Sequence, residues 1–416
     1  MNEWLRTVPD PRCDGKVKHE LNEILVCIIM VFLAGKTKLR GIVRWSRKHI
    51  DDLRKHMLFP NGVPSLSTIS RVLSALDEDM VSLAITNWIG EILNTRGIHI
   101  AIDGKGLRAA ARKIQDERTP YILNAIDTAT RLVIAQLAIP EKSSEISAIP
   151  NLLDIIEIEG SIITIDAIGT STVIMDKICK RGGNFVLQVK KNCPTLYEEL
   201  MLLFDGLEKE QKEDPDAFNK KYGDNYSKAE SHEKNRERYE YRKFRSYSEA
   251  DGISIFQEER PHVACVGRSD QVRIDVIQDA LGNDITPDLA TFLKEGSCKQ
   301  PKVTTGDSFH DDVQKVGLIA SKILDARTLK DIKRNHWHVE NGLHYVLDED
   351  FGEDKCTVRN GKNSLSILRK CAYNIVRLLQ IIEPEGRDYV PDVLDDISAD
   401  LEIGFKMIFE VIPSFY

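Results

Sequence analysis

The sequence predicts a mixed α/β fold in which helices flank a β-sheet. Three observations lead to this fold class. Apolar residues recur at helical spacing through residues 1–96, short β-branched runs begin at Gly97, and helical periodicity returns between residues 329 and 382. The chain has 416 residues, of which 42% are hydrophobic. This length and composition suffice for a large core and suggest two or three folded units.

Residues 1–96 are expected to form a helical domain. An apolar helix is predicted over residues 21–34, and its most apolar part is too short to span a bilayer. An amphipathic helix is predicted over residues 41–58. A capped helix is predicted after Pro64, where Ser and Thr residues precede Arg71. Hydroxyl residues at a helix N-terminus followed by an arginine are common in DNA recognition helices, although an ordinary capped helix has the same pattern.

Strand signals and helix signals alternate through residues 97–207. Strands are predicted over residues 97–103, 121–126, 132–139, 161–166 and 184–190, and the second and third form a hairpin around the polar turn 127–131. Helices are predicted over residues 143–157, 170–181 and 195–207. The order β-β-β-α-β-α-β-α is that of an RNase H-like fold, whose mixed sheet carries helices on both faces. We therefore expect a mixed sheet whose first and fourth strands are neighbours.

The remainder of the chain divides into three further segments. Residues 208–316 are predicted to be an insertion with β character, because a charged, Tyr-rich stretch is followed by strand-like pieces at 253–256, 262–266 and 272–277. Residues 317–382 are expected to complete the core with strong helices over 329–347 and 364–382. Residues 383–416 form an acidic tail with no clear pattern.

Composition and charge narrow the class of protein. The net charge is −8 and the pI is about 5.8, which counts against nucleic-acid binding. Residues 1–60, however, hold 12 Lys or Arg against 7 Asp or Glu, a local balance of +5. Eight cysteines are scattered without a CxxC pair, so a zinc ribbon is disfavoured. We expect reduced thiols in a cytoplasmic protein, because the first residues show no signal segment.

Two aspartates stand at the ends of apolar strands. Asp103 ends Ile-Ala-Ile-Asp, and Asp166 ends Ile-Thr-Ile-Asp. Each has an ordinary alternative, since Asp103 precedes a glycine in a possible turn and Asp166 can cap the following helix. In the predicted sheet, however, the two strands are neighbours, and the two carboxylates lie close together. A divalent cation is the usual compensation for such a pair.

A third acid is expected from a later helix that packs beside these strands. Glu340 lies at the margin of the apolar stripe Ile332, Val339, Leu343, Val346 and Leu347. His336 and His344 flank Glu340 at intervals of four residues. A zinc site on this face is the alternative, but neither half has the HExxH order. We expect the histidines to assist phosphate binding or to pack against Trp337 and Tyr345.

The sequence resembles a known family, the DDE-type insertion-sequence transposases, in the subgroup of H-repeat-associated proteins. The resemblance covers most of residues 10–380. The motifs that carry it are DPR at 10–12, GK at 15–16, PSxSTI at 64–69, IAIDGKxLR at 100–108, KSxEI at 142–146, IP at 149–150, TxDAxGT at 164–170, GGxFVL at 182–187, HWxVENxLHxxLD at 336–348 and FxED at 351–354.

The resemblance implies that Asp103, Asp166 and Glu340 form the catalytic and metal-binding triad. It also implies a DNA-binding region at the N-terminus, residues 1–96, and a β-rich insertion before the glutamate helix. The chain departs from the family pattern at Ser144, Ser171 and Cys193. It also departs from the Tyr-Arg-Glu-Lys signature of broader relatives, in which only Glu340 is retained.

The expected reaction is cleavage at transposon ends followed by transfer of the 3′-OH into target DNA. The three acids would bind two Mg²⁺ ions, for which Mn²⁺ can substitute. Double-stranded DNA is the expected partner, and a homo-oligomer is expected in the synaptic complex at the nucleoid. The candidate phosphate or DNA contacts are Lys105, Arg108, Lys190, Lys191, His336 and Arg71. The alternatives are a DNA-binding protein that does not cut, and a nuclease that only hydrolyses.

Overall fold

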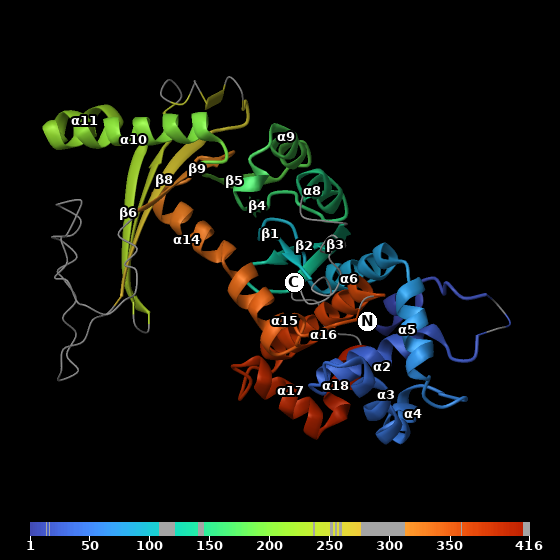
Figure 1. The fold of residues 1–416 in the computed structure, drawn as a ribbon. Coiled ribbons are helices and arrows are strands. Elements are labelled where there is room, and N and C mark those ends of the chain that lie inside the picture. Colours follow the sequence, from blue (N-terminus) through green and yellow to red (C-terminus); the bar gives the residue numbers. More distant parts are fainter. Residues whose placement is uncertain are drawn as a thin grey trace, which may run out of the picture. The chain divides into compact units, whose positions relative to one another are not determined.

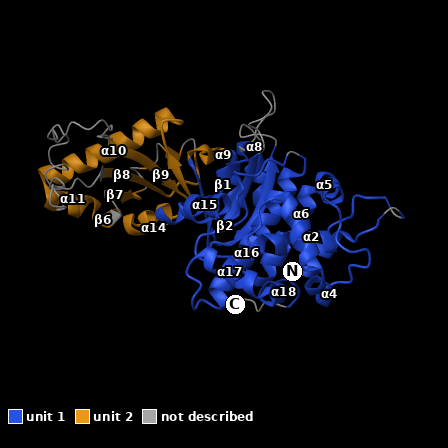
Figure 2. Ribbon diagram, turned by 60° about the horizontal axis from the view of Figure 1, so that its bottom comes forward, with its two compact units in different colours: residues 1–166, 173–184, 334–416 blue, residues 167–172, 185–333 orange. Residues whose placement is uncertain are grey.

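The computed structural model describes residues 1–13, 15, 17–107, 121–139, 145–235, 238–249, 253, 256–257, 260–275, 313–358 and 360–410. The chain forms two compact units (Figure 2). Unit 1 comprises residues 1–166, 173–184 and 334–416, and unit 2 comprises residues 167–172 and 185–333. The motif residue Arg108 lies outside the described residues. No helix of the described part of the chain is long and apolar enough to cross a membrane.

The N-terminal part of unit 1 is helical, as the sequence predicts (Figure 1). Its helices are α1 (Asn2–Arg6), α2 (Leu21–Leu33), α3 (Leu39–Lys48), α4 (Ile50–His56), α5 (Leu66–Ala75) and α6 (Glu78–Ile92). The single helix predicted over residues 41–58 is wrong, because the helix breaks at His49 into α3 and α4. α5 begins as predicted, since the Ser65 side chain accepts a hydrogen bond from the Thr68 backbone.

α2 is buried along almost its whole length and packs against α16 (Lys362–Ile382). Two predictions, a buried early helix and a strong late helix, are thereby confirmed. The acidic tail is not structureless: α17 (Val390–Ala399) and α18 (Leu401–Phe409) also pack on α2. Their apolar residues, such as Val393, Ile397 and Phe405, complete the core of unit 1.

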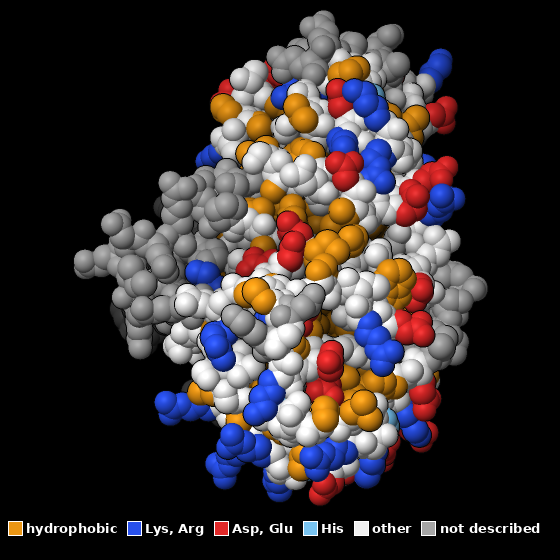
Figure 3. Space-filling model, turned by 90° about the vertical axis from the view of Figure 1, so that its right-hand side faces the viewer, with side chains coloured by type: hydrophobic (Ala, Val, Ile, Leu, Met, Phe, Trp, Pro, Cys, Tyr) orange, Lys and Arg blue, Asp and Glu red, His pale blue; other side chains and the backbone are white. Residues whose placement is uncertain are grey.

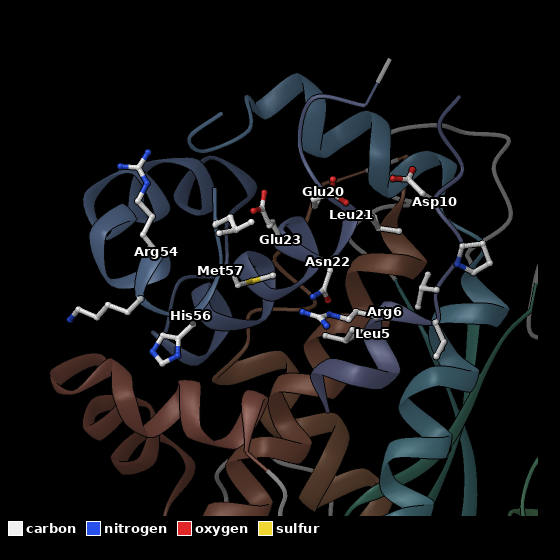
Figure 4. Close-up of a pocket in the computed structure, with 15 residues that line it drawn as sticks. Leu5, Arg6, Asp10, Glu20, Leu21, Asn22, Glu23, Arg54, His56 and Met57 are labelled. Carbon is white, nitrogen blue, oxygen red and sulfur yellow. The ribbon is translucent and has the colours of Figure 1, made fainter. Parts of the chain in front are cut away.

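A cavity of about 800 Å³ lies among these N-terminal helices (Figure 4). It is lined by residues 5–10 at the end of α1, 20–23 at the start of α2 and 54–58 at the end of α4. Beside it, the Glu23 carboxylate accepts a 2.7 Å hydrogen bond from the Phe59 backbone. This bond helps to hold Phe59 in the left-handed region, at a φ of 43°.

The sheet of unit 1 has the strand order β3-β2-β1-β4. Its strands are β1 (His99–Gly106), β2 (Tyr121–Asp127), β3 (Val133–Ile139) and β4 (Ile162–Ile165). β1 pairs antiparallel with β2 and parallel with β4, so the sheet is mixed and the predicted neighbours are neighbours. The predicted hairpin of β2 and β3 is also confirmed. The Asn374 amide hydrogen-bonds both backbone groups of Val133 at 2.9 Å and so completes the β3 edge.

Helices cover both sides of this sheet (Figure 1). α8 (Glu145–Asp154) packs against β2 and β3 on one side, and α6 and α16 pack against β3 on the other. α8 continues through Pro150 without restarting. α9 (Thr172–Lys180) follows β4 after the short helix η2 (Ala167–Gly169). The Arg181 side chain donates a 2.9 Å hydrogen bond to the Ile156 carbonyl and ties the end of α9 to the end of α8.

Unit 2 contains five strands in the order β5-β9-β8-β7-β6. Their bounds are β5 (Asn184–Val189), β6 (Tyr226–Asn235), β7 (Arg238–Tyr247), β8 (Cys265–Asp275) and β9 (Gln314–Ala320), and the helices α10 (Pro194–Glu213) and α11 (Pro215–Tyr222) lie between β5 and β6. The predicted β character is confirmed: the pieces predicted at 262–266 and 272–277 overlap the strand β8, whereas no described residue of the piece predicted at 253–256 is in a strand. β8 is one long strand, and Ile253 and Phe256 are helical.

Candidate active site

Asp103 and Asp166 follow matched positions on two paired strands. The register of β1 and β4 ends with Ile102 opposite Ile165, so each aspartate is the next residue along its strand. Both side chains are half-buried, and that of Asp103 is 21% exposed. Because β1 and β4 are parallel, the two aspartates lie at the same edge of the sheet, and the charge of Asp166 acts on Asp103.

Glu340 lies on an irregular helix of unit 1. The helix predicted over residues 329–347 is present but irregular: α14 (Ala326–His336) is followed by a π-helical turn, η3 (Val339–His344), and then by α15 (Tyr345–Glu349). The Tyr345 N–H donates to the Glu340 carbonyl, five residues earlier. Glu340 is exposed while Val339 and Leu343 are buried. Single π-helical turns inside helices are frequent at functional sites.

The two ends of this helical segment are attached to the two strands that carry the aspartates. His336 is buried, and its Nδ1 lies 2.9 Å from the Thr164 hydroxyl on β4. At the other end, the Lys105 ammonium on β1 donates a 3.1 Å hydrogen bond to the His344 carbonyl. Each attachment lies two residues from an aspartate of the site, Asp166 or Asp103. The segment that carries Glu340 is thereby fixed to both strands.

α16 holds the π-helical turn from the opposite side. The Tyr373 hydroxyl lies 3.1 Å from the Gly342 carbonyl, and the Arg377 guanidinium donates to the same carbonyl at 3.2 Å. Tyr373 is fully buried, and its hydroxyl also lies 3.0 Å from the Arg131 carbonyl in the β2–β3 turn. A hydroxyl has one proton, so Tyr373 donates to one of these carbonyls at a time. The altered helix geometry is therefore stabilised by donors from other elements.

Lys105 is the centre of a buried cluster of charges. Its side chain is 9% exposed and pairs with Asp348 and, at 3.2 Å, with Glu353. The Glu353 carboxylate also accepts a hydrogen bond from Ser366, and Lys370 lies beside it. Burial alone would raise the pKa of Glu353, but the charges of Lys370 and Lys105 outweigh it and lower the pKa to about 2. The cluster connects β1, α15 and α16.

The environment of Asp103 disfavours its charge. Burial raises the pKa of Asp103 to about 7, and the charges of Glu145, Glu340 and Asp166 act in the same direction. The Gly104 backbone N–H lowers the pKa in part. His344 lies 3.6 Å from the Asp103 carboxylate but does not compensate it, because burial and the charge of Lys105 lower the pKa of His344 to about 3. The imidazole is neutral at pH 7, so within the described part of the chain the charges that act on Asp103 are those of carboxylates.

Glu145, at the start of α8, was not assigned a role from the sequence. It is buried, and it hydrogen-bonds the Tyr121 hydroxyl. Burial and the Glu145 charge raise the pKa of Tyr121. The Tyr121 ring lies on Gly104, where a Cβ atom would come within 2.0 Å of a ring carbon. The KSxEI and DG motifs contain Glu145 and Gly104, so the sequence marked both residues, but neither motif shows what these residues contact.

The carboxylates of this site are of a chemical type that binds divalent cations. Their positions in the described part of the structure, however, are not those of a metal-binding group. Asp103, Asp166, Glu340 and Glu145 are hard oxygen ligands of the kind that Mg²⁺ prefers. The uncompensated charge of Asp103 is the observation that points to a cation. Yet among the residues that the structure describes, no group of three or more His, Cys, Asp or Glu side chains is arranged so that it could hold a metal ion. The His-based zinc site is absent from this part of the chain as well.

The other residues predicted to contact DNA are in different surroundings. Lys105 and His336 are buried and paired inside unit 1, which leaves neither free for a phosphate. Arg71 is exposed on α5, and its guanidinium donates to the Ser67 carbonyl at 3.3 Å. Lys190 is half-buried and Lys191 is exposed, both in unit 2 after β5.

Comparison with known proteins defines the class. A family model described as the transposase DDE domain matches residues 94–375, and a model described as DDE_Tnp_1-associated matches residues 2–89. The chain therefore belongs to the family of transposases with a DDE domain.

Its relatives place the chain more narrowly, beside the H repeat-associated proteins of Escherichia coli strain K12. The protein named "H repeat-associated putative transposase YhhI" is 30% identical over 378 residues, which cover 90% of this chain and 89% of the relative. "Putative protein YbfL" from the same strain is 30% identical over 379 residues, with 90% and 89% coverage. "Inactive transposase YbfQ", also from this strain, is 35% identical over 72 residues, which cover 17% of this chain and 86% of the relative.

Among solved structures, the chain is similar to a piggyBac transposase in a synaptic complex with hairpin DNA. The TM-score is 0.39 and the identity is 12%, over 95% of this chain and 75% of that chain. So distant a likeness carries no argument about the site.

Proposed function

We propose that this protein is a DNA transposase that cuts phosphodiester bonds at the ends of an element and joins the resulting 3′-OH to target DNA. The observation that carries the proposal is the position of Asp103. Its half-buried carboxylate lies at a strand end, where the charges of three other carboxylates, Asp166, Glu340 and Glu145, act on it and no cation among the described residues offsets them. Membership of the DDE family supports the same reading.

Asp103, Asp166 and Glu340 would hold Mg²⁺, with Mn²⁺ as a substitute. When bound, such ions stabilise the charge on the attacking and leaving oxygens of a phosphodiester and lower the pKa of water. Asp103 would be the central member of this ligand set, since the charges of Glu340 and Asp166 both act on its carboxylate. The strand order β3-β2-β1-β4 supports an RNase H-like core for this site.

The protein's own residues position the acids. The paired strands β1 and β4 fix the backbones of Asp103 and Asp166 at one edge. The Lys105 and His336 contacts hold the helical segment that presents Glu340 to that edge. Positioning of this kind, with reacting groups held in advance, is a large part of catalysis of phosphoryl transfer.

We further propose that residues 1–96 bind DNA and that residues 208–316 are an insertion in a core formed by 97–207 and 317–382. Arg71 and Lys191 remain candidate phosphate contacts because both are exposed. Double-stranded DNA is the proposed partner, and a homo-oligomer at the nucleoid is the proposed synaptic form.

The test is cleavage of a duplex that carries the element's end, in Mg²⁺ and in Mn²⁺. Asp103→Asn, Asp166→Asn and Glu340→Gln should each abolish cleavage while retaining DNA binding. Glu349→Gln is the matched control, because Glu349 is an exposed acid on the adjoining helix α15. Cleavage by all three site variants at the rate of the control would contradict the assignment.

A DNA-binding protein that no longer cuts is the second candidate. The observation in its favour is that the described acids do not form a ready metal-binding group. This candidate predicts a gel shift without strand cleavage in any divalent metal. A nuclease that only hydrolyses is distinguished by a target plasmid, since only a transposase yields strand-transfer products.

A further inference from the structure

The strongest concentration of positive charge in the described N-terminal helices lies at α3. The segment 36–48 has six basic residues and no acidic residue, in a chain whose net charge is −8. We define the basic face of α3 as the six exposed side chains Lys36, Lys38, Arg40, Arg44, Arg47 and Lys48. In Figure 3, Lys and Arg side chains gather at the lower end of the molecule, where α3 and α4 lie in Figure 1.

The helical members of this face point in one direction. Arg40, Arg44, Arg47 and Lys48 stand at positions i, i+4, i+7 and i+8, which share one side of an α-helix. The helix has 10 residues and is therefore about 15 Å long. Like charges at these spacings repel and destabilise the free helix. A surface that retains them is suited to a polyanion.

The acids nearby do not neutralise this face. In the part of the chain that the structure describes, none of the six cations takes part in an ion pair. The neighbouring acids, Asp51 and Asp52, are paired within α4, with Arg54 and Lys55 respectively. The charge of the basic face is therefore available to a ligand.

The face is also rigid. The opposite side of α3 is buried through Ile42, Trp45 and Ser46, and α3 packs against α2, α4 and α5. The loop before α3 is attached to the core, because the Arg369 guanidinium donates to the Thr37 carbonyl at 3.4 Å. Cations on a rigid scaffold contact phosphates with little loss of conformational entropy.

We propose that the basic face of α3 binds the phosphates of duplex DNA and is the main electrostatic contact of the N-terminal domain. The choice of DNA as the partner rests on the proposed function. The apolar side chains Ile42, Val43 and Trp45 of α3 are buried, which argues against insertion into a membrane. Trp45 is buried and stacks on His49 at 4.6 Å, so it offers no platform for unpaired bases. This assigns the main phosphate contact to α3 rather than to α5, whose single cation is Arg71.

The experiment measures the affinity for a 30-base-pair duplex by fluorescence anisotropy over a range of NaCl concentrations, in EDTA so that cleavage plays no part. The slope of log K against log salt should be smaller by about 2 in Arg44→Ala/Arg47→Ala, because each phosphate contact contributes about 0.9. At 0.1 M NaCl the loss of two contacts corresponds to roughly 60-fold weaker binding, taking 1 M salt as the reference. Arg44→Lys/Arg47→Lys keeps the charge and should retain the slope.

The matched control is Lys180→Ala/Lys406→Ala, which removes two exposed cations from α9 and α18 and should bind as the wild type does. An unchanged slope in Arg44→Ala/Arg47→Ala would overturn the proposal, as would an equal loss in the control or a larger loss in Arg71→Ala. Binding to phosphatidylserine vesicles that depends on Arg44 and Arg47, without binding to DNA, would also overturn it. Asp103→Asn should bind DNA as the wild type does. Loss of cleavage therefore tests the proposed active site, and loss of the salt-dependent affinity tests the basic face of α3, so the two proposals can fail independently.

Discussion

Replacing Lys105 with methionine should destabilise unit 1 by about 3 kcal/mol. The Lys105 ammonium pairs with Asp348 and Glu353, and the side chains of Lys105 and Glu353 are 9% and 1% exposed. Removal of one partner of a buried ion pair costs about 3–5 kcal/mol, because the other charge remains buried. The lower end applies here, since Lys370 remains beside Glu353. The contact with Glu353 is electrostatic, because its atoms do not have hydrogen-bond geometry.

The assay is urea denaturation followed by tryptophan fluorescence. With an m-value of about 3 kcal/mol/M, a loss of 3 kcal/mol lowers the midpoint by about 1 M. Lys406→Met, at an exposed position on α18, should leave the midpoint unchanged. The double variant Lys105→Met/Glu353→Gln should recover part of the loss, because it also removes the unpaired carboxylate. A Lys105→Met midpoint within about 0.2 M of the wild type would refute the role of the cluster.

Three further predictions concern the same unit. Tyr373→Phe removes a hydroxyl that contacts Gly342, so it should cost about 1–3 kcal/mol in a urea titration; amide exchange in residues 339–344 should accelerate, and unchanged exchange would argue against the α16 attachment. Gly104→Ala places a Cβ against the Tyr121 ring and should lower the melting temperature, whereas Gly104→Ala in a Tyr121→Ala background should be tolerated better if the clash is the cause. Burial lowers the pKa of His99 to about 3 from its ordinary value of 6.5. As the pH falls below 6.5, the unfolded chain binds a proton at His99 before the folded chain does. The free energy of unfolding is therefore unaffected above pH 6.5 and falls toward pH 3 by up to about 1.4 kcal/mol per pH unit. His99→Asn should flatten this dependence, and a slope unchanged between pH 7 and 5 would contradict it.

The strands of unit 1 were predictable because their signals are local. Alternating and β-branched residues mark β1 to β4, and the polar turn between β2 and β3 marks the hairpin. Once the strand order was known, the proximity of Asp103 and Asp166 followed from the parallel register. The same reasoning predicted that Glu340 lies at the margin of a buried stripe, and all five members of that stripe are buried.

In unit 2 the strand β5 was predicted, but β7 and most of β8 escaped prediction because charged residues lie in their interior. Arg245 on β7 and Arg268 on β8 are both 3% exposed, and both pair with Asp270. Arg245 also pairs with Glu208 from α10. A pattern that counts charged residues as exposed cannot recognise such strands, since the pairing that permits burial joins distant parts of the chain.

The π-helical turn and the burial of Lys105 escaped prediction for the same reason, because both depend on contacts with distant parts of the chain. The apolar stripe around Glu340 is equally compatible with an unbroken α-helix, and the donors that satisfy Gly342 come from α16. The DGK motif suggested a phosphate contact at Lys105, but the carboxylates that pair with Lys105 lie some 240 residues later. Local sequence reports the type of a residue, whereas tertiary pairing determines its role.

The central claim is that Asp103, Asp166 and Glu340 form one cation site. Isothermal titration of the full chain with Mn²⁺ tests it most directly, without DNA or cleavage. We expect Mn²⁺ to bind to the wild type and to Glu349→Gln, to fail to bind to Asp103→Asn, and to bind roughly 10-fold or more weakly to Asp166→Asn and Glu340→Gln. Binding of Mn²⁺ by Asp103→Asn with the affinity of the wild type would contradict the claim.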